Sequence, residues 1–184
     1  MTDIDYDLEF LEDGRTIELI SIGMVCDDGR EYYAVNRDMP VRRIRKDKWL
    51  MENVVPGLPK GQGDAKIHMP KRWLFHYADP VVKHRERIAD EVMDFIRAAG
   101  PEVRLWANYG AYDHVCLAQL WGRMVDLPEG VPMFTNDIQQ ERARLGLSWD
   151  KLPKQESGEH NALADARHNQ TVRRWLAEQE ARTS

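Results

Sequence analysis

The sequence is poor in the features that mark secreted and membrane proteins. It has only two cysteines, Cys26 and Cys116, which lie in apolar surroundings without metal-ligand spacing, so both are expected to be reduced core residues. No apolar run approaches the ~20 residues that span a bilayer, and the N-terminus is acidic rather than signal-like. These absences predict a cytoplasmic protein without a membrane segment.

An excess of positive charge is also missing, because the 184 residues carry a formal net charge of -5. A protein that holds duplex nucleic acid by its backbone alone is usually basic, so this chain requires basic patches, metal ions or a small substrate. A domain of this length buries roughly 70% of its unfolded surface. We expect a single domain over residues 1–184, with a long loop or insertion at 56–79 and a tail at 179–184.

Hydrophobic periodicity predicts an α/β fold with a mixed sheet. Alternation over residues 4–10, followed by apolar runs at 17–25 and 30–35 that a turn joins, predicts three successive antiparallel strands. Parallel strands are expected after them, and helices should flank the sheet. The remaining elements are helices at 41–55, 80–99, 111–121, 136 or 137 to 145 and 161–178, and short strands at 103–107 and 132–135. Trp49 is expected on the buried face of the first helix, and Val81 and Val82 on that of the second.

Four acids and one histidine, drawn from three separate segments, form a possible chemical site. Asp7 and Glu9 share one face of the first predicted strand, and Asp113 lies at a strand-to-helix junction. His160 opens the last predicted helix, and Asp165 lies little more than one turn beyond it. Acids on an edge strand are often merely solvated, and a histidine and an aspartate at a helix start often only cap it. All five together favour catalysis.

Hydrolysis of a phosphodiester requires neutralised charge, an activated water and in-line geometry, and two metal ions held by carboxylates supply all three. Mg²⁺ and Mn²⁺ prefer oxygen ligands. We therefore expect Asp7, Glu9 and Asp165 to bind two such cations directly, and Asp113 to bind the second ion directly or through water. His160 is the candidate general base, because an unperturbed histidine has a pKa near ~6.5.

The same segments resemble the three motifs of the DEDD superfamily of 3′–5′ exonucleases, in the branch with a histidine five places before the last aspartate. Residues 7–9 (D-L-E) match its D-x-E strand, 111–113 (A-Y-D) resemble its A-x-F-D segment, and 160–166 (H-N-A-L-A-D-A) match its H-x-A-x-x-D-A segment. Further stretches are similar to a small group of mycobacterial-type exoribonucleases, namely 6–10, 16–23, 30–35 and 110–114. That resemblance implies an RNase H-like fold, two divalent cations, an RNA substrate and a homodimer.

One position departs from the wider branch, which often places asparagine four residues before the second aspartate. Here that position is Tyr109, and Asn108 comes one place early, which leaves the sugar and base preference open. Substrate contacts are expected from Phe10, Tyr109, Tyr112 and His114, although the sequence favours a packed or solvated role for His114 over a ligand or substrate contact.

Aromatic and basic residues also alternate between the second and third predicted helices. Trp73, Phe75 and Tyr77 can stack on bases, bury the loop at 56–79 or make a dimer contact. The arginines within 42–45 and the basic pair at 71–72 can follow an RNA backbone or simply be solvated.

The sequence therefore predicts a metal-dependent 3′–5′ exoribonuclease that acts at the 3′ end of RNA and releases nucleoside 5′-monophosphates. One alternative is a DNA 3′–5′ exonuclease of the same fold, of the proofreading type. Another is a non-catalytic nucleotide-binding module, against which the intact set of acids and histidine argues.

Overall fold

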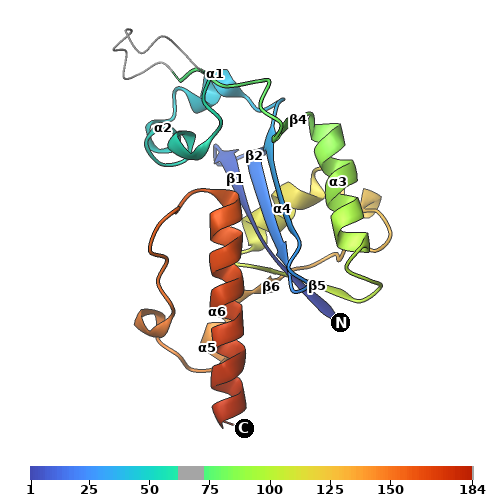
Figure 1. Ribbon diagram of the computed structural model, residues 1–184, viewed down its shortest axis with the longest axis vertical. Coiled ribbons are helices and arrows are strands. Elements are labelled where there is room, and N and C mark those ends of the chain that lie inside the picture. The colour runs from blue at the N-terminus through green and yellow to red at the C-terminus, as the bar shows by residue number, and fades with distance from the viewer. Residues whose placement is uncertain (62–72, 184) are drawn as a thin grey trace.

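A six-stranded mixed sheet with helices on both faces forms the protein (Figure 1). The computed structural model describes residues 1–61 and 73–183. The strands are β1 (Thr2–Glu12), β2 (Ile17–Cys26), β3 (Glu31–Asn36), β4 (Val82–Lys83), β5 (Val103–Ala107) and β6 (Asn136–Asp137), in the order β4-β3-β2-β1-β5-β6. The first three strands pair antiparallel. Strand β5 then pairs parallel with β1, and β6 pairs parallel with β5. The expected RNase H-like mixed sheet is therefore confirmed.

Side chains alternate along β1, and this alternation separates the core from the acidic face. Ile4, Tyr6 and Leu8 are buried against helices α3 (Arg85–Arg97) and α4 (Ala111–Ala118), which cover one face of the sheet. The intervening acids point to the other face, where helix α6 (Ala162–Thr183) packs on β1 and β2 (Figure 1). The remaining helices are α1 (Val41–Ile44), α2 (Lys48–Asn53) and α5 (Ile138–Arg144), with 3₁₀ turns at Val55–Gly57, Met124–Asp126 and Trp149–Lys151.

The expected helix over 41–55 is wrong, because the chain forms the two short helices α1 and α2 there. Asp47 interrupts the run: its backbone is extended, and its carboxylate caps α2 by accepting the N–H of Leu50 at 2.9 Å. The interruption turns Trp49 outward, so that 53% of its surface is exposed instead of buried.

The start of the predicted helix at 80 is also wrong. Val82 and Lys83 form β4, which pairs parallel with the end of β3, and α3 begins only at Arg85. The β-branched pair at 81–82 suits this extended edge, and Asp38 accepts the N–H of Arg85 at 2.9 Å where the helix begins. The short strand expected at 132–135 is found immediately after those residues, as β6. Helix α6 continues through most of the expected tail and ends at Thr183.

Burial decides several of the remaining expectations. Cys26 and Cys116 are buried free thiols, as predicted. Trp73 and Phe75 are buried as well, which favours the loop-packing role over base stacking, whereas Tyr77 is 46% exposed. The basic pair at 71–72 and most of the predicted loop lie outside the described residues. Within the residues that are described, no helix has the length and apolarity of a bilayer span.

Candidate active site

Three of the predicted acids meet over the middle of β1. Asp7, Glu9 and Asp165 each offer a carboxylate oxygen, and these oxygens all lie within 4.8 Å of one another. Asp7 and Glu9 share a face because strand side chains alternate, and Asp165 lies in the first turn of α6, which packs over that face. The structure thus brings together carboxylates that are more than 150 residues apart.

Asp113 joins this cluster from the edge of β1. The strand pairs with β5 only from Thr2 to Asp5, so the N–H of Leu8 has no partner in that ladder. Asp113, in the first turn of α4, accepts this N–H at 2.9 Å and is buried. The place where β5 diverges from β1 therefore fixes the fourth carboxylate next to Asp7.

Two acids of this cluster, Asp7 and Glu9, have no basic partner among the described residues. Burial and repulsion from neighbouring acids raise the pKa of Glu9 to about 8 and that of Asp7 well above its usual value. Burial also raises the pKa of Asp113 to about 7, although the Leu8 N–H opposes it. Within the described part of the chain, the side chains of Asp7 and Glu9 accept no hydrogen bond and form no ion pair with a basic group. The site is therefore arranged to bind cations from solution.

Gly23 allows α6 to approach the sheet closely enough to complete the site. It pairs directly with Asp7 in the β1–β2 ladder. A Cβ at Gly23 would lie 2.3 Å from the backbone carbonyl of Ala162, at the start of α6. Only glycine permits this contact, so the first turn of α6 rests on the β2 backbone and Asp165 reaches Asp7. We missed this role, whose signal was a glycine within an apolar strand.

Further along α6, Arg173 fixes the helix over the other half of β1. Its guanidinium donates to Asp5 at 2.8 and 2.9 Å, to Asp3 at 2.9 Å and to Asp27 at 2.7 Å. Arg104 also pairs with Asp3, at 2.6 Å. Arg173 and Asp5 are buried, so this network holds α6 in register with β1. No local pattern in the sequence predicts this network.

A second close approach positions α4. A Cβ at Gly110 would lie 2.9 Å from the Cβ of Ala107, at the end of β5. The N–H of Gly110 donates to Asp137 at 2.7 Å, and the same Asp137 side chain caps α5 as predicted. Gly110 therefore sets the start of the helix that carries Asp113.

His160 precedes α6 and holds Asp165 through its backbone. Its N–H donates to one oxygen of Asp165 at 2.9 Å, and Gln155 donates to the other at 2.6 Å. His160 has a φ of 62°, a conformation that costs a non-glycine residue roughly 1–2 kcal/mol. Its ring meets that of Trp49 edge to face, with centroids 4.9 Å apart. The imidazole is thus placed at the rim of the carboxylate cluster.

The expected substrate contacts divide into two groups. Phe10 and Tyr112 adjoin the cluster acids, and their rings are nearly parallel, with centroids 6.4 Å apart and planes at 19°. Tyr112 is 57% exposed and therefore accessible to a ligand. His114 instead turns toward the core, where its Nδ1 lies 3.5 Å from the hydroxyl of Tyr6. This arrangement favours the packed role for His114.

Tyr109 occupies the position where the wider branch often has asparagine. It has a φ of 55°, is 62% exposed and stacks on Trp149 with ring centroids 6.3 Å apart. Asn108 does not take its place at the surface, because its Oδ1 accepts a hydrogen bond from Gln139 at 2.7 Å. An exposed aromatic pair has therefore replaced the amide at this position.

Comparison with known proteins identifies the family of this chain. Pop2p of S. pombe, solved in a form with bound Mg²⁺ and Mn²⁺, is similar with a TM-score of 0.45 and 11% identity, over 95% of this chain and 81% of that one. Two relatives from Mycobacterium tuberculosis, 3′–5′ exoribonuclease Rv2179c (strain H37Rv) and 3′–5′ exoribonuclease MT2234.1 (strain CDC 1551), are each 40% identical over 163 residues, 88% of this chain and 85% of theirs. The model of the 3′–5′ exoribonuclease Rv2179c-like domain matches residues 71–176. The chain therefore belongs to the Rv2179c-like 3′–5′ exoribonuclease family.

Proposed function

We propose that the protein is a divalent-metal-dependent 3′–5′ exoribonuclease that releases nucleoside 5′-monophosphates from the 3′ end of RNA. The observation that carries this proposal is the cluster of four carboxylates, in which Asp7 and Glu9 have no basic partner among the described residues. Family membership supports the RNA substrate and the direction of degradation.

The donor set suits Mg²⁺ or Mn²⁺, because it consists of carboxylate oxygens only. Asp7, Glu9 and Asp165 would hold one cation, and Asp113 would complete the site of a second. Two cations held there neutralise the phosphodiester charge and make the attacking water more acidic. They would also relieve the repulsion that contributes to the raised pKa values of Asp7, Glu9 and Asp113.

His160 acts as the general base in this proposal. Its imidazole is not required as a ligand, because hard cations prefer the carboxylates, and it belongs to the residue whose backbone N–H donates to Asp165. It accepts the proton of the attacking water, while the edge contact with Trp49 holds its ring in place. Phe10, Tyr109 and Tyr112 supply exposed or half-exposed rings on which the bases near the 3′ end can stack.

Degradation of matched 5′-labelled RNA and DNA strands tests the proposal. With manganese, the wild type should shorten RNA stepwise from its 3′ end and release monophosphates, and chelation should stop the reaction. Asp165→Asn should remove turnover and weaken manganese binding in calorimetry while the protein remains folded. Faster degradation of DNA would support the proofreading alternative, and binding of nucleotides without turnover would support the non-catalytic one.

A second experiment isolates His160. His160→Ala should lower turnover by about 10²–10⁴-fold, as expected for a lost general base, and leave manganese affinity nearly unchanged. His160→Gln is the matched variant, because it retains a polar side chain that does not titrate near neutral pH. Near-normal turnover of His160→Ala under saturating manganese and RNA would show that another group accepts the proton.

We further propose that the protein is a cytoplasmic homodimer. The family resemblance supports the dimer, and the two free buried thiols suit a reducing compartment. Trp73 and Phe75 are covered by their own chain, so they no longer argue for a dimer contact at 56–79. Light scattering at micromolar concentration should report twice the mass of one chain, and a monomer would refute the dimer.

A further inference from the structure

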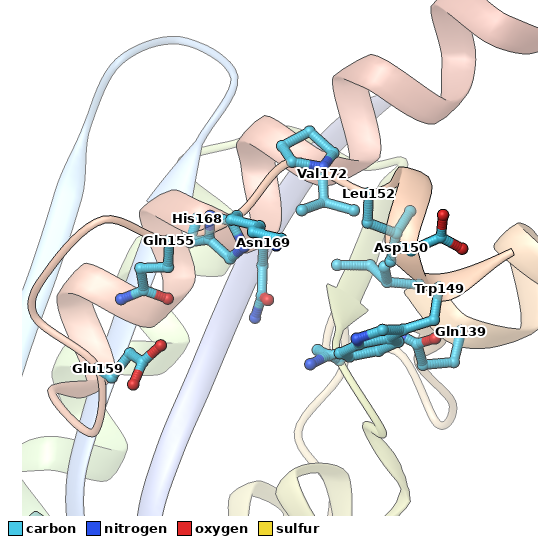
Figure 2. Close-up of a pocket in the computed structure, with 13 residues that line it drawn as sticks. Gln139, Trp149, Asp150, Leu152, Gln155, Glu159, His168, Asn169 and Val172 are labelled. Atoms are coloured by element: carbon cyan, nitrogen blue, oxygen red, sulfur yellow. The ribbon is translucent and has the colours of Figure 1, made fainter.

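A cavity of about 470 Å³ lies between α6, α5 and the segment that connects them (Figure 2). Two of its lining residues donate hydrogen bonds to the carboxylate cluster or to the backbone beside it. Gln155 lines the cavity and donates to Asp165, and Asn169 lines it and donates at 3.1 Å to the carbonyl of Tyr6, which precedes Asp7. A molecule in this cavity would therefore lie next to the reacting phosphodiester.

The walls of this cavity combine apolar and polar surfaces. Ile138, Leu152 and Val172 form its apolar part. Trp149, which is 57% exposed, lies across the cavity from Asn169 (Figure 2). Such a mixture, in a space of this size, is typical of a pocket for a small aromatic ligand.

Two amide groups on these walls are available to a ligand. Among the residues that the structure describes, Asn108 Nδ2 and Gln155 Oε1 have no hydrogen-bond partner, although the other amide atom of each residue is bonded. One donor and one acceptor thus remain, which is the complement that the edge of a nucleobase requires.

Charge decides which part of a nucleotide fits. The lining includes Asp150 and Glu159 against one lysine, Lys154, and one histidine, His168, whose pKa burial lowers, and it contains no arginine. A phosphate group would meet a net negative wall, whereas an uncharged planar base would not. The cavity therefore suits the base and not the backbone of a nucleic acid.

We propose that this cavity binds one nucleobase of the RNA strand while the 3′-terminal phosphodiester lies at the carboxylate cluster. The base stacks on Trp149, and its edge pairs with Asn108 and Gln155. The inference rests on the proposed function, and it makes Trp149 a residue that selects RNA long enough to reach the cavity.

Adenosine, which carries no phosphate, probes the cavity without catalysis. In nuclear magnetic resonance titrations of the metal-free full chain, adenosine should shift the indole N–H of Trp149 and the side-chain amides of Asn108 and Gln155. Trp149→Ala should weaken adenosine binding at least about fivefold, the lower end for loss of one stacked base. Phe134→Ala is the control, because Phe134 is 68% exposed but does not line the cavity. Shifts confined to other residues, or equal shifts with ribose 5-phosphate, would overturn the proposal.

RNA that carries one abasic nucleotide at successive positions from the 3′ end tests the same contact during turnover. The wild type should show a KM raised at least about fivefold at one position, and Trp149→Ala should show no further rise there. An equal rise in both proteins would mean that Trp149 does not hold that base and would overturn the proposal. Absence of RNA hydrolysis would instead overturn the proposed function, and the adenosine titration alone would then decide the cavity.

Discussion

Two of the four acids in a row along one face of β1 have a basic partner, and the other two have none among the described residues. Asp3 and Asp5 lie on the same strand face, under the same helix, as Asp7 and Glu9. Asp5 is fully buried, and burial raises its pKa to about 6 against the opposing effect of Arg173. Glu9 is slightly more exposed, yet its pKa is raised to about 8. The difference shows that a basic partner, and not depth, separates a structural acid from one that needs a cation.

Helix α6 creates this difference through its register. Arg173 and Asp165 are eight residues apart, about 12 Å along a helix. Asp5 and Glu9 are four residues apart, about 13 Å along a strand. The two spacings match, so the basic residue meets the first half of the row while the acidic residue meets the second.

Removal of Arg173 should destabilise the protein, because Arg173 neutralises the acids in the first half of β1. Arg173→Met retains much of the stem but leaves Asp5 buried without its basic partner and Asp3 with Arg104 as its remaining one, so the free energy of unfolding should fall by about 3–5 kcal/mol. Urea denaturation measures the loss. Arg174→Met is the matched control, because the exposed Arg174 pairs with Asp27 alone among the residues described, at 3.1 Å, and should change stability by less than about 1 kcal/mol. Equal losses for both variants would contradict the comparison.

The acids of the cluster should make the metal-free protein less stable as pH rises. The folded pKa values of Glu9 and Asp113, about 8 and about 7, exceed their ordinary values of 4.5 and 3.8. Between these limits the folded state binds more protons than the unfolded chain, so its stability is present at low pH and declines toward pH 8 by about 1.4 kcal/mol per pH unit for each proton. Urea denaturation at several pH values, in chelator, measures this slope. Manganese should flatten it, and a rise in stability with pH in chelator would contradict the assignment.

Gly23 should be intolerant of any side chain, since the close approach of α6 depends on it. Gly23→Ala should lower the free energy of unfolding by about 1–3 kcal/mol and reduce turnover, because α6 must move away from β2. Gly57→Ala is the control: the nearest atom to its Cβ would be 3.6 Å away, so little should change. Wild-type RNA turnover in Gly23→Ala would show that Asp165 does not require this contact.

Replacing an acid by its isosteric amide should change stability in opposite directions at Asp7 and at Asp5. In chelator at pH 8, Asp7→Asn should stabilise the protein, because it removes a buried charge and the repulsion that it meets in the cluster. Asp5→Asn should destabilise it, because Arg173 loses its principal partner. Thermal unfolding of both variants provides the test, and the same sign for both would refute the distinction.

Local patterns predicted the strands and helices whose faces are clearly marked. The alternation over 4–10 located β1, and the apolar runs located β2 and β3. The same reasoning failed at 41–55 and at 80–84, where the helix pattern continued across Asp47 and across Val81 and the β4 residue Val82. In both places a cap or a strand partner outweighed the local helix preference.

The sequence by itself determined which acids form the site and which face of β1 bears them, because strand alternation and the spacing of His160 and Asp165 are local properties. Only the tertiary structure decided which acids on that face of β1 are neutralised by a basic residue. Arg173 is 168 residues from Asp5, and the contact between Gly23 and Ala162 joins segments that no periodicity connects. Both depend on how closely and in which register α6 packs on the sheet, and these are properties of packing between distant elements.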